Sequence, residues 1–114
     1  MEAALAEAAI EREELSAIET HDCFSIAALI NLEDLGVAEP GTGIRFYREE
    51  GRRGLAVNRS GGLKACGHPV AATGVKQVLD VMKELERSKA QYGLAHNFGG
   101  VGASAAVHIL IYAP

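Results

Sequence analysis

The chain has few of the large side chains that usually build a hydrophobic core. Its 114 residues include three phenylalanines, three tyrosines and no tryptophan, although 48% of all residues are hydrophobic. Alanine accounts for 19 residues, so much of this hydrophobic content is small. The length is that of a single domain. We expect its backbones to pack closely together, or against further protein.

Cysteine and positive charge are also scarce. Cys23 and Cys66 are too few for a disulfide framework, which favours a reducing, cytoplasmic setting. With 11 basic and 15 acidic residues the net charge is −4, so we expect no nucleic-acid partner. The sequence has no apolar run near the roughly 18 residues that span a bilayer. Its acidic, alanine-rich start is not typical of a signal peptide, and we expect no membrane association.

The order of the predicted elements is typical of an α/β fold. We expect helices at about 2–9, 23–35 and 69–87, strands at 15–20 and 55–58, and a C-terminal hairpin within 92–112. Asp22 is a predicted N-cap and Gly36 a predicted C′ residue of the second helix. Pro69 is predicted to open the third helix. Residues 37–56 form a mixed, charged surface excursion with some strand character.

The third predicted helix has an apolar stripe and a start made of small residues. The stripe consists of Val75, Val78, Leu79, Met82 and Leu85. Small residues at Ala71, Ala72 and Gly74 would let another backbone approach closely. We therefore expect this end of the helix to be buried against another element.

Three of the four histidines lie at predicted boundaries of helices or strands. His21 follows a strand, His68 precedes a helix, and His96 ends a strand ahead of a glycine run. Ligands of α/β sheets favour the carboxyl ends of strands, and a helix N-terminus helps keep a histidine neutral. Cys23 lies at a predicted helix start, where the pKa of a thiol falls.

Each of these residues also has a purely structural interpretation. A histidine in a loop is commonly a polar boundary residue, and a cysteine is commonly a small buried apolar one. His108 lies within a predicted strand and is interpreted as structural. The histidines and cysteines lack CxxC or HxxxH spacing, so we expect no metal site.

Three motifs, in this order, resemble the C-terminal half of a thiolase. They are HDCF at 21–24, NRSGGLKACGHPVAATG at 58–74 and AHNFGGVG at 95–102. The resemblance is greatest to the sterol-carrier-protein-2-type and archaeal thiolases and covers nearly the whole chain. It implies an α/β domain with a mixed sheet and helices on its faces. It also implies that the sequence lacks the first strand of this half and the entire N-terminal half, which holds the nucleophilic cysteine.

The resemblance assigns roles to individual residues. His68, in the Gly-His-Pro loop, would help activate the nucleophilic cysteine, and His21 would help hold the thioester oxygen in an oxyanion hole. Cys23 would move the α-carbon proton. His96 stands where most thiolases have a catalytic cysteine, and its role is less defined. The residues expected to bind substrate are Gly67, Phe98, Gly99 and Gly100.

The implied function is that of the C-terminal part of an acyl-CoA thiolase of the acetyl-CoA acetyltransferase type. Its substrate would be a coenzyme A thioester, with no cofactor, in Claisen condensation or thiolysis. The chain is expected to be inactive alone and to pair with a second copy, or with a separate N-terminal half. Two alternatives remain open: a non-catalytic thiolase-like assembly module, and part of a thiolase-like aldolase that cleaves a β-hydroxyacyl-CoA.

Overall fold

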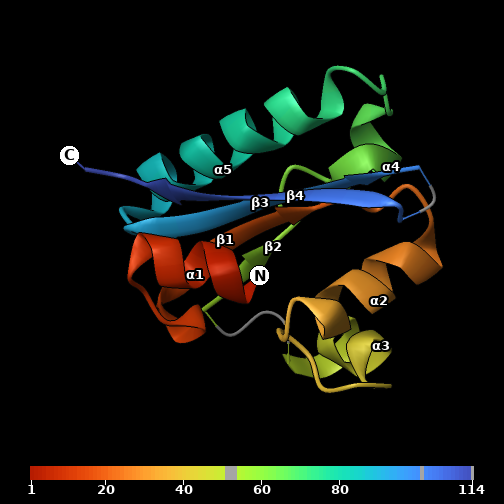
Figure 1. Cartoon of the computed structure of the whole chain (residues 1–114), viewed down its shortest axis with the longest axis horizontal. Helices are drawn as coiled ribbons and strands as arrows, with labels where there is room; N and C mark the ends of the chain where they lie inside the picture. The colour runs from red at the N-terminus through yellow and green to blue at the C-terminus, as the bar shows by residue number, and fades with distance from the viewer. Residues whose placement is uncertain (51–53, 101, 114) are drawn as a thin grey trace.

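The computed structural model describes residues 1–50, 54–100 and 102–113, which form a mixed sheet covered by helices (Figure 1). The strands are β1 (Leu15–Thr20), β2 (Ala56–Val57), β3 (Tyr92–Gly99) and β4 (Ser104–Ile111). They lie in the order β2-β1-β3-β4. β1 is parallel to β2 and to β3, whereas β4 pairs antiparallel with β3. The α/β fold with a mixed sheet and the C-terminal hairpin are confirmed.

The long helix α5 (Thr73–Ser88) packs across one face of the sheet. Its Val81 and Leu85 contact Ala17 and Ala95 in a buried cluster. A Cβ atom added to Gly93 would lie only 2.5 Å from Cγ1 of Val81, so the helix approaches the strand too closely for a side chain there. The small residues therefore serve the close backbone packing that the composition indicates.

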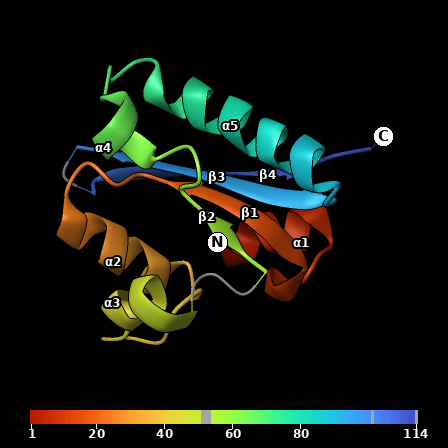
Figure 2. The same ribbon diagram turned by 180° about the vertical axis from the view of Figure 1, so that it is seen from behind.

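Other helices lie on the opposite face of the sheet, and the view from behind shows the same two layers (Figure 2). Helix α1 (Glu2–Ala8) packs over the sheet, with α2 (Ser25–Asp34) and α3 (Gly43–Arg45) on the same side. The main hydrophobic core lies here and is built from larger residues: Leu5, Ile10, Leu15, Ile18, Leu35 and Leu94.

Two of the predicted helix starts are wrong. α2 begins at Ser25 with Phe24 as its N-cap residue, and Asp22 instead accepts a hydrogen bond from the backbone N–H of Leu63 at 2.7 Å. α5 begins at Thr73, four residues after Pro69, whose carbonyl accepts hydrogen bonds from the backbone N–H groups of Ala72 and Thr73. Both residues fasten the loop ahead of α5. Gly36 follows the C-cap of α2 with φ +67°, as predicted.

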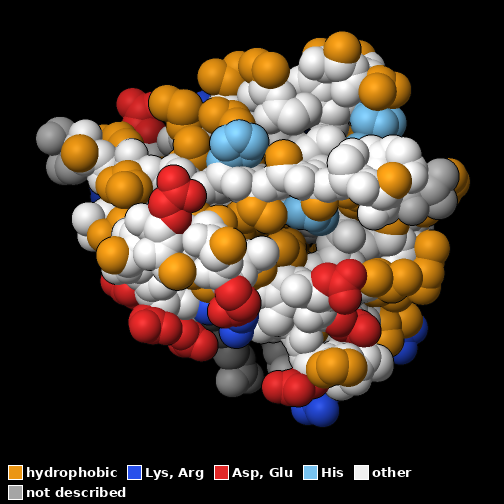
Figure 3. Space-filling model, in the orientation of Figure 1, with side chains coloured by type: hydrophobic (Ala, Val, Ile, Leu, Met, Phe, Trp, Pro, Cys, Tyr) orange, Lys and Arg blue, Asp and Glu red, His pale blue; other side chains and the backbone are white. Residues whose placement is uncertain are grey.

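Only part of the predicted apolar stripe of α5 faces the sheet: Leu85 is buried and Val78 packs against the same cluster, whereas the other three members point away. The buried positions are Thr73, Gln77, Val81 and Leu85, which recur every fourth residue. Val75, Leu79 and Met82 are exposed. Hydrophobic side chains are visible over α5 in Figure 3. The expected burial of Gly74 does not occur within this chain, because a Cβ atom there would meet nothing within 4 Å.

The excursion after α2 is helical rather than strand-like. α3 leads directly into a π-helical turn, η2 (Phe46–Glu50). The segment is held against α2, since the backbone N–H of Gly43 donates to Oε1 of Glu33 at 2.9 Å. A short helix that the sequence analysis missed, α4 (Gly62–Cys66), precedes the Gly-His-Pro loop. Residues 51–53 of the predicted excursion and Val101 of the third motif lie outside the described residues.

Candidate active site

Four side chains that are far apart in the sequence line one cavity of about 680 Å³: His21, Cys23, His68 and His96. Histidine atoms lie in a hollow between the sheet edge and the helices below it in Figure 3. Phe98, Gly99 and Gly100 line the same cavity, whereas Gly67 does not. The structure thus brings the four predicted catalytic residues together, along with three of the four predicted substrate-binding residues.

The parallel arrangement of β1 and β3 explains this convergence. Their carboxyl ends meet at one edge of the sheet, and His96 lies directly opposite Thr20, the last residue of β1. His96 is not the end of its strand as predicted, because β3 continues to Gly99. His21 and Cys23 follow β1, and the loop between α4 and α5 contributes His68.

The aromatic rings in the cavity form one connected group. The ring centroids of His21 and His68 are 4.7 Å apart with an interplanar angle of 87°, an edge-to-face contact. Phe98 packs against His21 at 4.5 Å and lies 6.2 Å from His96. Phe98 thus links the two buried histidines and restricts how their rings can turn.

The surroundings of His21 and His96 lower their pKa values and thereby favour the neutral imidazole. Burial lowers the pKa of His21, and the nearby His68 lowers it further. Burial also lowers the pKa of His96, with a second contribution from His21. A helix N-terminus was the expected cause of neutrality, but the largest cause of the lowered pKa at both His21 and His96 is loss of solvent. Neutral imidazoles can accept or donate a proton near pH 7.

The family model for the thiolase C-terminal domain-like family matches residues 1–112. The chain belongs to the thiolase C-terminal domain-like family. The recognised resemblance is therefore confirmed at the level of the family.

Named relatives of this thiolase C-terminal domain include two archaeal proteins. An acetyl-CoA acetyltransferase of Methanothermobacter thermautotrophicus is 44% identical over 106 residues, which cover 84% of this chain and 28% of that protein. An acetyl-CoA acetyltransferase of Methanocaldococcus jannaschii is 36% identical over 116 residues, which cover 89% of this chain and 30% of that protein. Sterol carrier protein 2 of Homo sapiens is 37% identical over 100 residues, which cover 79% of this chain and 18% of that protein. The chain spans less than a third of the length of these relatives.

Hydrogen bonds position the histidines of this thiolase domain through residues that the sequence analysis missed. Thr20 contacts His96 Nδ1 at 2.8 Å. Gln77, on α5, donates to the carbonyl of His96 at 3.0 Å and accepts from the Asn97 side chain at 2.8 Å. These partners lie as many as 76 residues apart in the sequence. A polar residue on the buried face of a helix, such as Gln77, was the available signal.

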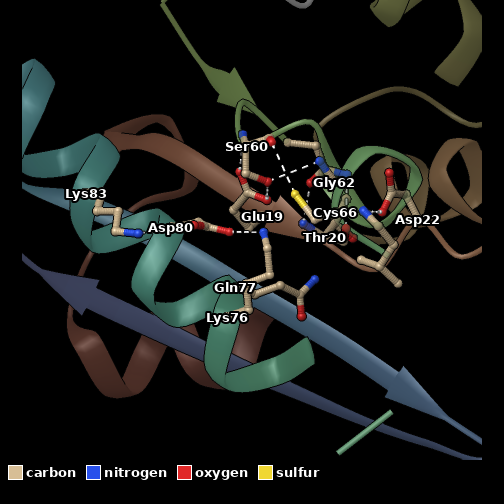
Figure 4. Close-up of polar contacts among 12 residues, drawn as sticks. Glu19, Thr20, Asp22, Ser60, Gly62, Cys66, Lys76, Gln77, Asp80 and Lys83 are labelled. Carbon is tan, nitrogen blue, oxygen red and sulfur yellow. Dashed lines mark hydrogen bonds and ion pairs between the residues drawn. The ribbon is translucent and has the colours of Figure 1, made fainter. Parts of the chain in front are cut away.

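Buried carboxyl groups fasten the loop that leads to His68 (Figure 4). Glu19 accepts hydrogen bonds from the Ser60 backbone N–H at 3.0 Å and from the Ser60 hydroxyl at 2.7 Å. Burial raises the pKa of Glu19, and these two hydrogen bonds oppose the shift. Gly62 has φ +62°, and a Cβ atom there would lie 2.1 Å from Oδ2 of Asp22. The start of α4 therefore requires glycine beside this carboxylate.

The two cysteines have different surroundings. Cys23 is half-buried and lines the cavity, whereas Cys66 is exposed and does not. The Sγ atom of Cys66 lies 3.5 Å from the carbonyl oxygen of Ser60. A thiol outside the cavity cannot act on a substrate bound there. This agrees with the expectation that the nucleophilic cysteine belongs to the N-terminal half.

The rest of the cavity wall is mainly apolar. Phe24, Ala27 and Ile30 extend along one face of α2, and Val70 lies on the wall as well. Such a wall can contact an acyl group while the imidazoles contact polar atoms. Within residues 1–50, 54–100 and 102–113, no group of three or more histidines, cysteines and carboxylates could hold a metal ion. None of the helices in these ranges combines the length and apolar character needed to cross a bilayer.

Proposed function

We propose that this chain is the C-terminal part of an acyl-CoA thiolase of the acetyl-CoA acetyltransferase type. The observation that carries the proposal is the convergence of His21, Cys23, His68 and His96 on one cavity. Membership of the thiolase C-terminal domain-like family supports the reaction class. The substrate would be a coenzyme A thioester, and the reaction would need no further cofactor. A cytoplasmic location is part of the proposal.

The chemistry suits these side chains. Thioester exchange requires a thiolate, a base to form it, and hydrogen-bond donors directed at the developing oxyanion. In the proposed mechanism His68 takes the proton from the nucleophilic cysteine and His21 donates to the thioester oxygen. Cys23 moves the proton at the α-carbon of the second substrate. The half-buried position of Cys23 on the cavity wall, among neutral imidazoles, supports this role.

The nucleophile would come from an N-terminal thiolase half. The chain covers only 28% and 30% of the two archaeal acetyltransferases, which leaves most of such an enzyme outside this sequence. The exposed Val75, Leu79 and Met82 on α5 would be covered by that half, or by a second copy of this chain. The small residues at the start of α5 leave space for such a neighbour.

The experiment combines this chain with the N-terminal half of the Methanothermobacter acetyltransferase and measures acetoacetyl-CoA thiolysis. We expect no activity from the chain alone and activity from the pair. In the pair, His68→Ala should lower the rate by about 10²- to 10⁴-fold, the usual contribution of a general base. Cys66→Ala, outside the cavity, should have no effect and is the matched control.

Three results would overturn the proposal. Thiolysis by the chain alone, abolished by Cys66→Ala, would make Cys66 a nucleophile in its own right. Tight association with the N-terminal half, but no thiolysis and no effect of His68→Ala, would favour a non-catalytic assembly module. Cleavage of a β-hydroxyacyl-CoA without thiolysis would favour the aldolase.

A further inference from the structure

Two histidines of the cavity each contact a threonine hydroxyl through the same ring nitrogen. The Nδ1 atom of His68 lies 2.6 Å from Oγ1 of Thr73, and the Nδ1 atom of His96 lies 2.8 Å from Oγ1 of Thr20. A hydroxyl has one proton to donate, but it can also accept. The direction of each hydrogen bond therefore decides which nitrogen of the neutral imidazole carries the proton.

The direction at Thr73 follows from its second partner. Its hydroxyl donates to the carbonyl of Pro69 at 3.0 Å, and the residue is buried. With its only proton used there, Thr73 can only accept from His68. The proton of neutral His68 then lies on Nδ1, and Nε2 keeps a free lone pair.

The direction at Thr20 is the opposite. Thr20 is fully buried, and His96 Nδ1 is the one partner of its hydroxyl within the described residues. If the hydroxyl accepted from Nδ1–H, its own proton would be buried without an acceptor, which costs about 1–3 kcal/mol. Donation to Nδ1 avoids this cost. The proton of neutral His96 then lies on Nε2, which becomes a donor.

We propose that Thr20 and Thr73 are positioning residues that give His96 and His68 opposite tautomers. His68 presents a lone pair at Nε2 and acts as the base, whereas His96 presents an N–H at Nε2 and acts as a donor. The assignment of roles rests on the proposed function, but the assignment of tautomers does not. It also separates His96 from the acid-base step, which leaves proton transfer at the α-carbon to Cys23.

Burial makes the distinction consequential. An imidazolium carries protons on both nitrogens and has no tautomer, so the difference exists only where the ring is neutral. Burial lowers the pKa of His96 and thereby favours the neutral ring. Where both rings are neutral, the pair supplies one acceptor and one donor without any change in charge.

The test is long-range ¹H–¹⁵N correlation spectroscopy of the histidine rings in the ¹⁵N-labelled 114-residue chain, at a pH where the imidazoles are neutral. We expect a protonated Nδ1 for His68 and a protonated Nε2 for His96. His108 is exposed on β4, and its ring is the internal reference for a histidine whose two tautomers interconvert in contact with solvent. The same tautomer at both residues, or the reverse assignment, would overturn the inference.

Variants test whether the threonines cause the difference. Thr73→Val should shift His68 toward the Nε2–H tautomer, because Nδ1–H loses its acceptor, and Thr73→Ser should keep the wild-type spectrum. Thr20→Val should move the unprotonated Nδ1 resonance of His96 further downfield, because it loses a donated hydrogen bond. Thr20→Ser should leave it in place. A wild-type spectrum for either valine variant would contradict the role of that threonine.

The two proposals fail separately. Wrong tautomers in an active reconstituted enzyme would reject the role of the threonines and leave the thiolase function intact. If the tautomers are as proposed but this chain combined with the N-terminal half shows no activity, the thiolase function is rejected and the role of the threonines is kept.

Discussion

The side-chain amide of Asn58 forms hydrogen bonds with both backbone groups of Thr20. The N–H of Thr20 donates to Oδ1 of Asn58 at 2.7 Å, and Nδ2 of Asn58 donates to the Thr20 carbonyl at 3.0 Å. β2 ends at Val57, so this amide continues the pairing of β2 with β1 for one more residue. It also ties the start of the Gly-His-Pro segment to the strand end that leads into the HDCF motif.

Removal of this amide should destabilise the fold. In Asn58→Ala both backbone groups of Thr20 lose their partner in a part-buried position. We expect the free energy of unfolding to fall by about 1–3 kcal/mol, measured by urea denaturation. Gln91→Ala, which removes an exposed amide, is the control and should have little effect. Equal midpoints for the two variants would contradict this expectation.

Glycines at Gly93 and Gly74 should respond in opposite ways to alanine. At Gly93 the new methyl group would meet Val81 at 2.5 Å and the carbonyl oxygen of Ala17 at 3.2 Å. We expect a loss of about 1–3 kcal/mol of stability from overpacking, measured by thermal or urea denaturation.

The Gly74→Ala variant is the matched control. Gly74 lies in α5 with open space around it, so alanine should stabilise the isolated chain by about 0.5–1 kcal/mol. If an N-terminal half covers this end of the helix, the same variant should weaken its binding. Loss of stability in the isolated chain would contradict the open space at this position.

The buried histidines should make stability fall on acidification. The folded-state pKa values of His21 and His96 lie below the usual value near 6.5, so the unfolded chain binds protons first as the pH falls. Their contribution to stability is complete above about pH 6.5 and decreases below it. The raised pKa of Glu19 acts in the opposite direction, so wild type must be compared with a variant.

His96→Gln is that variant, and the free energy of unfolding is measured across the pH range. The slope of unfolding free energy against pH should be smaller in this variant than in the wild type, by up to about 1.4 kcal/mol per pH unit. His108→Gln, at an exposed position, should keep the wild-type slope. Parallel profiles for wild type and His96→Gln would contradict the proposed origin of the pH dependence.

The outer face of α5 should drive association. Leu79 and Met82 have exposed fractions of 49% and 53%, and they border a groove shared with Leu110, Ile111 and Tyr112. We expect the 114-residue chain to self-associate at micromolar concentration, as measured by sedimentation. The double variant Leu79→Glu, Met82→Glu should raise the monomer fraction.

Ile26 on α2 provides the control for this association. It is 63% exposed, so Ile26→Glu removes a similar apolar surface from another helix. We expect this variant to associate as the wild type does. A monomeric wild type that binds no hydrophobic dye would identify a self-sufficient domain instead.

Local sequence patterns predicted β1, the C-terminal hairpin and the long helices, and they singled out the four residues that line the cavity. Strand β1, the C-terminal hairpin and the C′ glycine of α2 depend on neighbouring residues, because hydrophobic alternation and a positive φ are local properties. The motifs that carry His21, Cys23, His68 and His96 could be recognised for the same reason. That they share a cavity followed from the expectation that catalytic groups gather at the carboxyl ends of parallel strands.

The tertiary structure alone decided which face of α5 is buried and which hydrogen-bond partners the buried polar residues have. Val75, Leu79 and Met82 form as good an apolar stripe as Val81 and Leu85, and periodicity cannot choose between two such faces. The buried face includes Gln77 because its amide finds partners on β3, which are distant in sequence. The partners of Thr20, Glu19 and Asp22 are likewise about 40 to 76 residues away. Such contacts exist only once the chain has folded, because hydrogen bonding depends on distance in space rather than along the sequence.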